Sequence, residues 1–303
     1  MTSLARTVDL AAPPRRQASL WGDAWRRLIR NKMAVLGAVI VVLLLLVALF
    51  AGQLAPYDPT AQDMMSTFAP PGPAHPFGAD QLGRDQLSRL IYGARVAVTV
   101  GIFTQFVILA IGLPIGSVAA LMGGKVDNLL MRFTDIIYAF PDLLLIILLS
   151  TALRGNPLKA VWGGLLIMFF AIGVANWVGI ARLIRGQLLS LKEREFVEAA
   201  RALGAGNAHI IVKHLLPNAL GPIIVQVTFG IPFAIFTEAT LSFLGLGITP
   251  PNPSWGSMIQ DGYQAIFAYP YLVLGPALCI AITLLAFTFL GDGLRDALDP
   301  RTK

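Results

Sequence analysis

Residues 198–217 read EAARALGAGNAHIIVKHLLP and form a polar stretch between two long apolar segments. Gly204 and Gly206 predict the end of a helix, because glycine tolerates the backbone angles of a helix stop. Asn207 is the expected N-cap of a second short helix that runs to about His214. The stretch therefore predicts a helix, a glycine corner and a second helix, which together offer another protein a compact surface.

The composition of the chain places this corner on a membrane protein. The 303 residues are 56% hydrophobic and only 13% charged, with a mean hydropathy of +0.70, which is too apolar for a soluble domain of this size. The net charge is +6, but the basic residues cluster between apolar segments and form no single patch with aromatic residues. We therefore expect a lipid bilayer around the chain and no nucleic-acid partner.

Six apolar segments are long enough to cross a hydrocarbon core of about 30 Å. They predict an all-α integral membrane protein with transmembrane helices at residues 33–53, 96–124, 129–153, 159–182, 215–237 and 271–290. The first segment begins too late and is too long for a signal peptide. Pro141 is expected to kink the third helix, and glycines of the second are expected to allow close helix packing (Gly101, Gly112 and Gly116).

The segments between these helices complete the predicted organisation. Residues 1–18 lack periodicity and are expected to be disordered. Helical spacing of tryptophan and leucine after them predicts a helix in the headgroup layer, although a simple extension of the first transmembrane helix explains the pattern equally well. The expected parts are a cytoplasmic tail with this interfacial helix (1–32), the first transmembrane helix (33–53), a proline-rich extracytoplasmic segment (54–94), a core of five transmembrane helices (95–292) that includes a cytoplasmic loop (186–217), and a cytoplasmic tail (293–303).

Residues 239–258 are apolar enough to suggest another transmembrane helix, but their glycines and prolines argue against one continuous helix. We expect an outward loop that folds back onto the bundle. The distribution of basic residues sets the orientation. With both ends in the cytoplasm, eighteen of the 23 lysines and arginines lie inside, as the positive-inside rule requires.

The spacing of the polar stretch resembles the EAA loop of bacterial ABC importer permeases. The pattern is E-A-A, three residues, Gly204, nine residues, an apolar residue, one residue and then Leu216-Pro217. His214 takes the apolar position, which departs from the broad family but suits its peptide-importer branch. Residues 75–95 (HPFGADQLGRDQLSRLIYGAR), 241–247 and the tail GDGLRDALDPR are also similar to the C-type subunits of dipeptide and oligopeptide importers (DppC and OppC).

The resemblance implies a role and a set of partners. It implies that the loop lies in a groove of a separate cytoplasmic ATPase, so that these residues couple ATP hydrolysis to membrane motion: Glu198, Ala199, Ala200, Gly204, Ala205, Gly206, Asn207, Ala208, His209, His214 and Pro217. It also implies a DppB- or OppB-like partner permease, two nucleotide-binding domains that bind MgATP, and an extracytoplasmic peptide-binding protein in a bacterial inner membrane. This chain itself is expected to bind no cofactor. Dipeptides or short oligopeptides are the expected cargo, with nickel chelates or glutathione as alternatives.

The charge of Glu198 and the small size of the two alanines after it suggest their roles in the loop. Glu198 is expected to pair with Arg194 or Arg201, and Ala199 and Ala200 are expected to let the ATPase approach closely.

Polar residues in apolar segments are the candidates for the translocation pathway, because ionisable groups are costly at membrane depth. These candidates are Gln105, Asp142, Asn176 and Glu238. Asp135 is expected to have a structural role, paired with Arg132 or with an arginine of the loop. A metal site at His75 and Asp80 is a weak possibility, since no second histidine or cysteine lies near them in the sequence.

The sequence contains no evident motif for nucleotide binding or for catalysis. Gly124-Lys125 lacks the other residues of a phosphate-binding loop, no HExxH motif occurs, and Cys279 is isolated in an apolar segment. A secondary transporter remains an alternative, although Asp142 and Glu238 do not occupy matching positions of two repeated halves. Transport driven by a separate ATPase subunit explains these features better than ion-coupled transport does.

Overall fold

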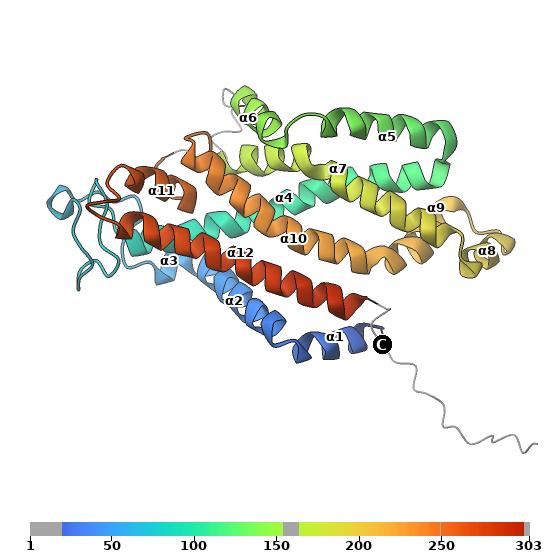
Figure 1. The fold of residues 1–303 in the computed structure, drawn as a ribbon, viewed down its shortest axis with the longest axis horizontal. Coiled ribbons are helices and arrows are strands. Elements are labelled where there is room, and N and C mark those ends of the chain that lie inside the picture. Colours follow the sequence, from blue (N-terminus) through green and yellow to red (C-terminus); the bar gives the residue numbers. More distant parts are fainter. Residues whose placement is uncertain (1–19, 154–163, 249, 300–303) are drawn as a thin grey trace, which may run out of the picture.

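The computed structural model describes residues 20–153, 164–248 and 250–299, and over these residues the protein is a bundle of helices without β-strands (Figure 1). The expectations for residues 1–18, for the start of the fourth transmembrane helix at residue 159 and for the last tail residues lie outside this part. The main elements are α1 (Leu20–Arg30), α2 (Lys32–Leu49), α3 (Ala51–Leu54), η1 (Met64–Ser66), α4 (Gln86–Met122), α5 (Gly124–Tyr138), α6 (Asp142–Ala152), α7 (Leu165–Lys192), α8 (Glu195–Ala202), α9 (Asn207–Ile210), η4 (Ile211–Leu215), α10 (Leu216–Phe243), α11 (Trp255–Tyr263) and α12 (Tyr271–Leu298).

Five helical stretches are long and apolar enough to cross a membrane: α2, α4, α7, the continuous stretch 207–243, and α12. The predicted third transmembrane helix consists of two helices, α5 and α6, with an angle of 85° between them. Pro141 precedes α6 with extended backbone angles. Because proline has no N–H and disfavours helical angles in the residue before it, the helix breaks here instead of kinking gently. The count is six if the bent pair makes one crossing.

The long helices extend beyond the apolar segments that predicted them. α4 begins at Gln86 because Asp85 is its N-cap, with the Asp85 carboxylate accepting the backbone N–H of Ser88 at 2.8 Å. α10 continues through Glu238 to Phe243, and α12 continues to Leu298. Hydropathy marks the lipid-buried part of a helix, and the polar turns beyond it still satisfy their backbone hydrogen bonds within the helix.

The centre of the bundle is the close contact between α4 and α7. A Cβ atom at Gly112 would lie 2.1 Å from Ile180 Cγ2, and one at Gly116 would lie 2.4 Å from the carbonyl oxygen of Ala181. The third glycine of this set, Gly101, faces α10 instead. The glycines therefore allow the close helix packing that their positions predicted.

α1 is a separate helix, not a straight extension of α2. Asn31 lies between them as the N-cap of α2, and its side-chain oxygen accepts the backbone N–H groups of Met33 and Ala34 at 3.1 and 3.2 Å. α1 packs beside the end of α12, where Arg27 donates to the carbonyl oxygen of Asp299 at 3.2 Å.

The segment before α4 is held on the bundle by buried charges. Asp80 accepts hydrogen bonds from Arg84 and Arg89, and both arginines also pair with Asp261 of α11, at 2.9 and 3.0 Å. His75 pairs with Asp85 at 2.9 Å. His75 and Asp80 therefore have different partners, which does not support a metal site shared by the two.

α11 fulfils the expectation of a loop that folds back. Its Trp255 is buried and donates from Nε1 to the carbonyl oxygen of Leu90 in α4 at 3.0 Å. Figure 1 shows α11, α3 and the segment before α4 at one end of the bundle, and α1, α8, α9 and the end of α12 at the other.

Candidate functional site

The polar stretch forms a tight corner at the end of α8. Gly204 has φ +83°, and its N–H donates to the carbonyl oxygen of Arg201 at 2.9 Å. The N–H of Ala205 donates to the carbonyl oxygen of Ala200 at 3.0 Å. This pair of bonds is a Schellman motif, which requires a residue in the left-handed conformation. No atom lies within 4 Å of a Cβ built at Gly204, so only its backbone angle demands glycine.

The second glycine of the corner has a different position from the one expected. Gly206, with φ −72° and ψ 158°, is the N-cap of α9, and Asn207 is the first residue of that helix. The expectation that Asn207 caps the helix is therefore wrong. Gly206 has extended backbone angles that any residue can adopt. Of the two glycines, only Gly204 therefore has the left-handed conformation that favours glycine.

α9 is joined to α10 without a break. Residues 211–215 form one wide π-helical turn, in which the N–H of Leu216 donates to the carbonyl oxygen of Ile211. Pro217 follows in the first turn of α10, where its missing N–H is tolerated. The predicted short helix does not end near His214, because the wide turn carries the chain directly into the next helix.

The inner face of the corner is apolar and packed. Val197 and Ala200 of α8 lie in one buried cluster with Ile210, Ile211 and Leu215. Ile184 and Leu188 of α7 belong to the same cluster. Ala200 therefore faces the bundle, and the expectation that it lies on the surface offered to a partner is wrong.

The outer face of the corner is exposed. Glu198, Ala199, Ala208 and His209 lie on it. Among the described residues no ion pair includes Glu198, so the expected pairing with Arg194 or Arg201 is not formed.

Two large apolar side chains also project from this face: Leu203 is 89% exposed and Val212 is 68% exposed. The sequence analysis missed Leu203 as a surface residue. Its position directly before a helix-stop glycine was the available signal, since the residue at a helix end often points outward.

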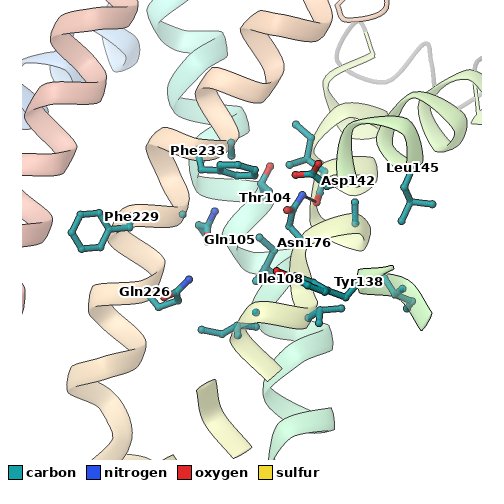
Figure 2. A pocket seen from close by; sticks show the side chains of 18 of the residues that line it. Thr104, Gln105, Ile108, Tyr138, Asp142, Leu145, Asn176, Gln226, Phe229 and Phe233 are labelled. Atoms are coloured by element: carbon teal, nitrogen blue, oxygen red, sulfur yellow. Dashed lines mark hydrogen bonds between the residues drawn. The ribbon is translucent and has the colours of Figure 1, made fainter. Parts of the chain in front are cut away.

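A cavity of about 660 Å³ lies between α4, α5, α6, α7 and α10 (Figure 2). Its polar side chains come from all five helices: Thr104 and Gln105 from α4, Tyr138 from α5, Asp142 from α6, Asn176 from α7 and Gln226 from α10. The structure thus brings together three of the four pathway candidates, which are far apart in the sequence. Thr104 and Gln226 were not predicted, although they give the same signal as Gln105 and Asn176, a polar residue in an apolar segment.

The polar groups of the cavity differ in what they contact. Gln105 is 5% exposed, and within the part of the chain that the structure describes neither its Nε2 nor the Thr104 hydroxyl has a hydrogen-bond partner. The Gln105 side chain lies against Gly230, where a Cβ would approach its Oε1 to 2.4 Å. Asn176 donates to the carbonyl oxygen of Ile172 at 2.9 Å. Asp142 is exposed and accepts the N–H of Leu143 at 2.8 Å.

Glu238, the fourth pathway candidate, does not line the cavity. It is 1% exposed, and the Ser242 hydroxyl donates to its Oε1 at 2.6 Å. α10 continues past Glu238, so its carboxyl group faces the bundle near the loop that leads to α11.

Asp135 has the structural role expected of it, but with another partner. It pairs with Arg182 of α7 at 2.8 Å, not with Arg132 or with an arginine of the loop.

Comparisons with known proteins place these features in context. A family described as "Binding-protein-dependent transport system inner membrane component" matches residues 112–303, and "N-terminal TM domain of oligopeptide transport permease C" matches residues 19–71. The oligopeptide transport system permease protein OppC of Bacillus subtilis (strain 168) is 42% identical over 299 residues, covering 99% of this chain and 95% of that protein.

Two further relatives differ in the cargo that they are named for. The dipeptide transport system permease protein DppC of Bacillus subtilis (strain 168) is 43% identical over 282 residues, covering 93% of this chain and 86% of that protein. The glutathione transport system permease protein GsiD of Escherichia coli O6:K15:H31 (strain 536 / UPEC) is 40% identical over 284 residues, covering 93% and 91%.

The fold has a counterpart among solved structures. An inward-facing form of the MetNI methionine ABC transporter matches with a TM-score of 0.56 and 22% identity, covering 70% of this chain and 97% of that one.

Proposed function

Because this chain belongs to the family of binding-protein-dependent transport system inner membrane components, we propose that it is the C-type permease subunit of an importer for dipeptides or short oligopeptides. It is a multi-pass inner-membrane protein and a transport subunit, not an enzyme. In this family a separate ATPase subunit supplies the energy, and a partner permease and a substrate-binding protein complete the importer.

The observation that carries the proposal is the corner at Gly204. Its inner face is fixed by packing against α7, and its outer face exposes apolar side chains at Leu203 and Val212. Leu203 and Val212 give this projection exposed apolar area that contact with another protein would bury. We assign this outer face to the ATPase, with MgATP bound by that subunit.

The path of force follows from the continuity of the helices. The stretch 207–243 carries the corner at one end and Gln226, Gly230 and Phe233 of the cavity wall further along. A push on the corner is therefore transmitted along one helical rod to the cavity. Closure of two ATPases would tilt this rod against a second, DppB- or OppB-like permease and alternate the access of the cavity.

The proposed orientation puts both chain ends in the cytoplasm. The excess of basic residues in the segments assigned to the inside supports it. So does the arrangement in Figure 1, where α1, the end of α12 and the corner share one end of the bundle. The opposite end, with residues 54–85 and α11, then faces the extracytoplasmic peptide-binding protein.

Reconstitution tests the proposal. The chain should co-purify with a partner permease and soluble ATPases, and proteoliposomes of this complex should take up a tripeptide only with its binding protein and ATP. ATP hydrolysis by the purified chain alone would contradict it. Peptide uptake driven by an ion gradient without ATP would favour a secondary transporter instead.

A further inference from the structure

We propose that the cavity between α4, α5, α6, α7 and α10 is a cargo subsite that selects for positive charge, with Asp142 receiving a cationic group of the peptide. This inference rests on the proposed function and adds the charge class of the cargo. A peptide offers such a group as its terminal ammonium or as a basic side chain.

The position of the cavity suits a transported molecule. Gln105, Asn176 and Gly230 lie near the middles of α4, α7 and α10, so the cavity is deep in the bundle and far from both ends. Figure 2 shows Asp142 and Asn176 on one side of it, with Gln226 facing them from α10. A charged group at this depth is costly unless it faces a cavity or a partner.

Two buried polar residues lie in the wall of the cavity. Gln105 and Thr104 both line it, and among the described residues neither the Gln105 Nε2 nor the Thr104 hydroxyl has a hydrogen-bond partner. Buried polar groups are normally paired, and an unpaired one carries a desolvation cost. Gly230 leaves room for the Gln105 side chain, which a Cβ would displace. The donor and acceptor capacity of these groups matches the amide groups of a peptide backbone.

The charge of the cavity is negative. Of the described residues that line it, Asp142 alone is charged at neutral pH, and none is lysine, arginine or histidine. The Arg182 guanidinium lies 4.7 Å from the centre of the Tyr138 ring, which also lines the cavity, but it is paired with Asp135. Asp142 belongs to no ion pair within the described residues. Its carboxylate is therefore available to a cation from the cargo.

A simpler role for Asp142 is to stabilise the start of α6, because an acidic residue is favourable at a helix N-terminus. That role does not depend on the cargo. The two roles are separated by comparing cargoes of different charge in the same variant.

The test uses the complete importer in proteoliposomes, with saturating binding protein and three tripeptides that have lysine, alanine or glutamate at the centre. We expect Asp142→Asn to slow uptake of the lysine peptide about tenfold, which is the size expected for a lost charge-assisted hydrogen bond, and that of the glutamate peptide least. Asp142→Glu should keep the wild-type order. The matched control, Asp292→Asn, removes an exposed carboxylate of α12, which does not line the cavity, and should change no ratio between the peptides.

A second variant tests the selection for cargo charge with a residue of α10, on the side of the cavity opposite Asp142. Gln226→Lys adds a cation to the cavity and should shift uptake towards the glutamate peptide, even if Asp142→Asn fails to assemble. Equal losses for all three peptides in Asp142→Asn, or an unchanged order in Gln226→Lys, would overturn the inference while leaving peptide import intact. No uptake of any of the peptides by the wild-type importer would overturn the proposed function as well.

Discussion

Gly204 and Gly206 are two residues apart and make different demands on the backbone. Gly204 has φ +83°, which costs other residues about 1–2 kcal/mol, whereas Gly206 has extended angles. Both have open space where a Cβ would stand. Within the described part of this chain, a substitution at either position therefore acts through the backbone and not through side-chain collisions.

We predict that Gly204→Val uncouples ATP hydrolysis from uptake. A β-branched residue is strained at this φ, so the corner should open and lose its fixed position on α7. Peptide taken up per ATP hydrolysed in proteoliposomes should fall several-fold, with the complex still inserted in the membrane. Gly206→Ala is the matched control and should behave as wild type. Normal coupling in Gly204→Val would show that the corner does not transmit the movement of the ATPase to the membrane helices.

At the scale of elements, the fold depends on where helices break and where they continue. Pro141 breaks α5 from α6 and brings Asp142 to the cavity, while the π-helical turn before Pro217 keeps α9 continuous with α10. α11 is held in place by a cluster of four charged residues. In this cluster Arg84 and Arg89 each pair with Asp80 and with Asp261 of α11.

We predict that Asp80→Asn destabilises the packing of residues 54–85 against α11. Asp80 is 2% exposed and accepts from Arg84 and Arg89, so its loss leaves two buried guanidinium groups with one partially exposed acid. Removing one partner of a buried ion pair costs about 3–5 kcal/mol. Thermal unfolding of the purified complex should show a clear drop in Tm.

Two further variants calibrate this effect. Asp261→Asn should cost less, because the Asp261 side chain is 30% exposed and water screens its charge. Asp58→Asn, at an exposed position outside the cluster, should leave the Tm unchanged. A Tm for Asp80→Asn equal to that of Asp58→Asn would show that the cluster does not hold this segment.

At the scale of the whole molecule, the two ends of the bundle consist of different elements. One end gathers α1, the corner and the end of α12, and the other gathers residues 54–85 and α11 (Figure 1). The cavity lies between them and is open in part, as expected where a second permease completes the wall.

Cysteine labelling tests this arrangement. In a Cys279→Ala background, a cysteine at Ala208 should react with a membrane-impermeant thiol reagent only from the cytoplasmic side. A cysteine at Met65, where the native side chain is 95% exposed, should react only from outside. Both positions are exposed, so a difference in labelling reports their side of the membrane. Labelling of residue 208 from outside would invert the proposed topology and remove the ATPase from the corner.

The sequence by itself determined the helical membrane class, the apolar segments and the corner, because these depend on the length of apolar runs and on where glycine and proline stand along the chain. It also identified Gln105, Asp142 and Asn176 as polar residues in apolar surroundings. Only the tertiary structure decided that these three share a cavity while Glu238 is bonded to Ser242, and that Ala200 faces inward. The facing of a helix residue is fixed by packing between segments distant in sequence, which no local pattern records. Pro141 marked the place of the break between α5 and α6, but not its angle of 85°.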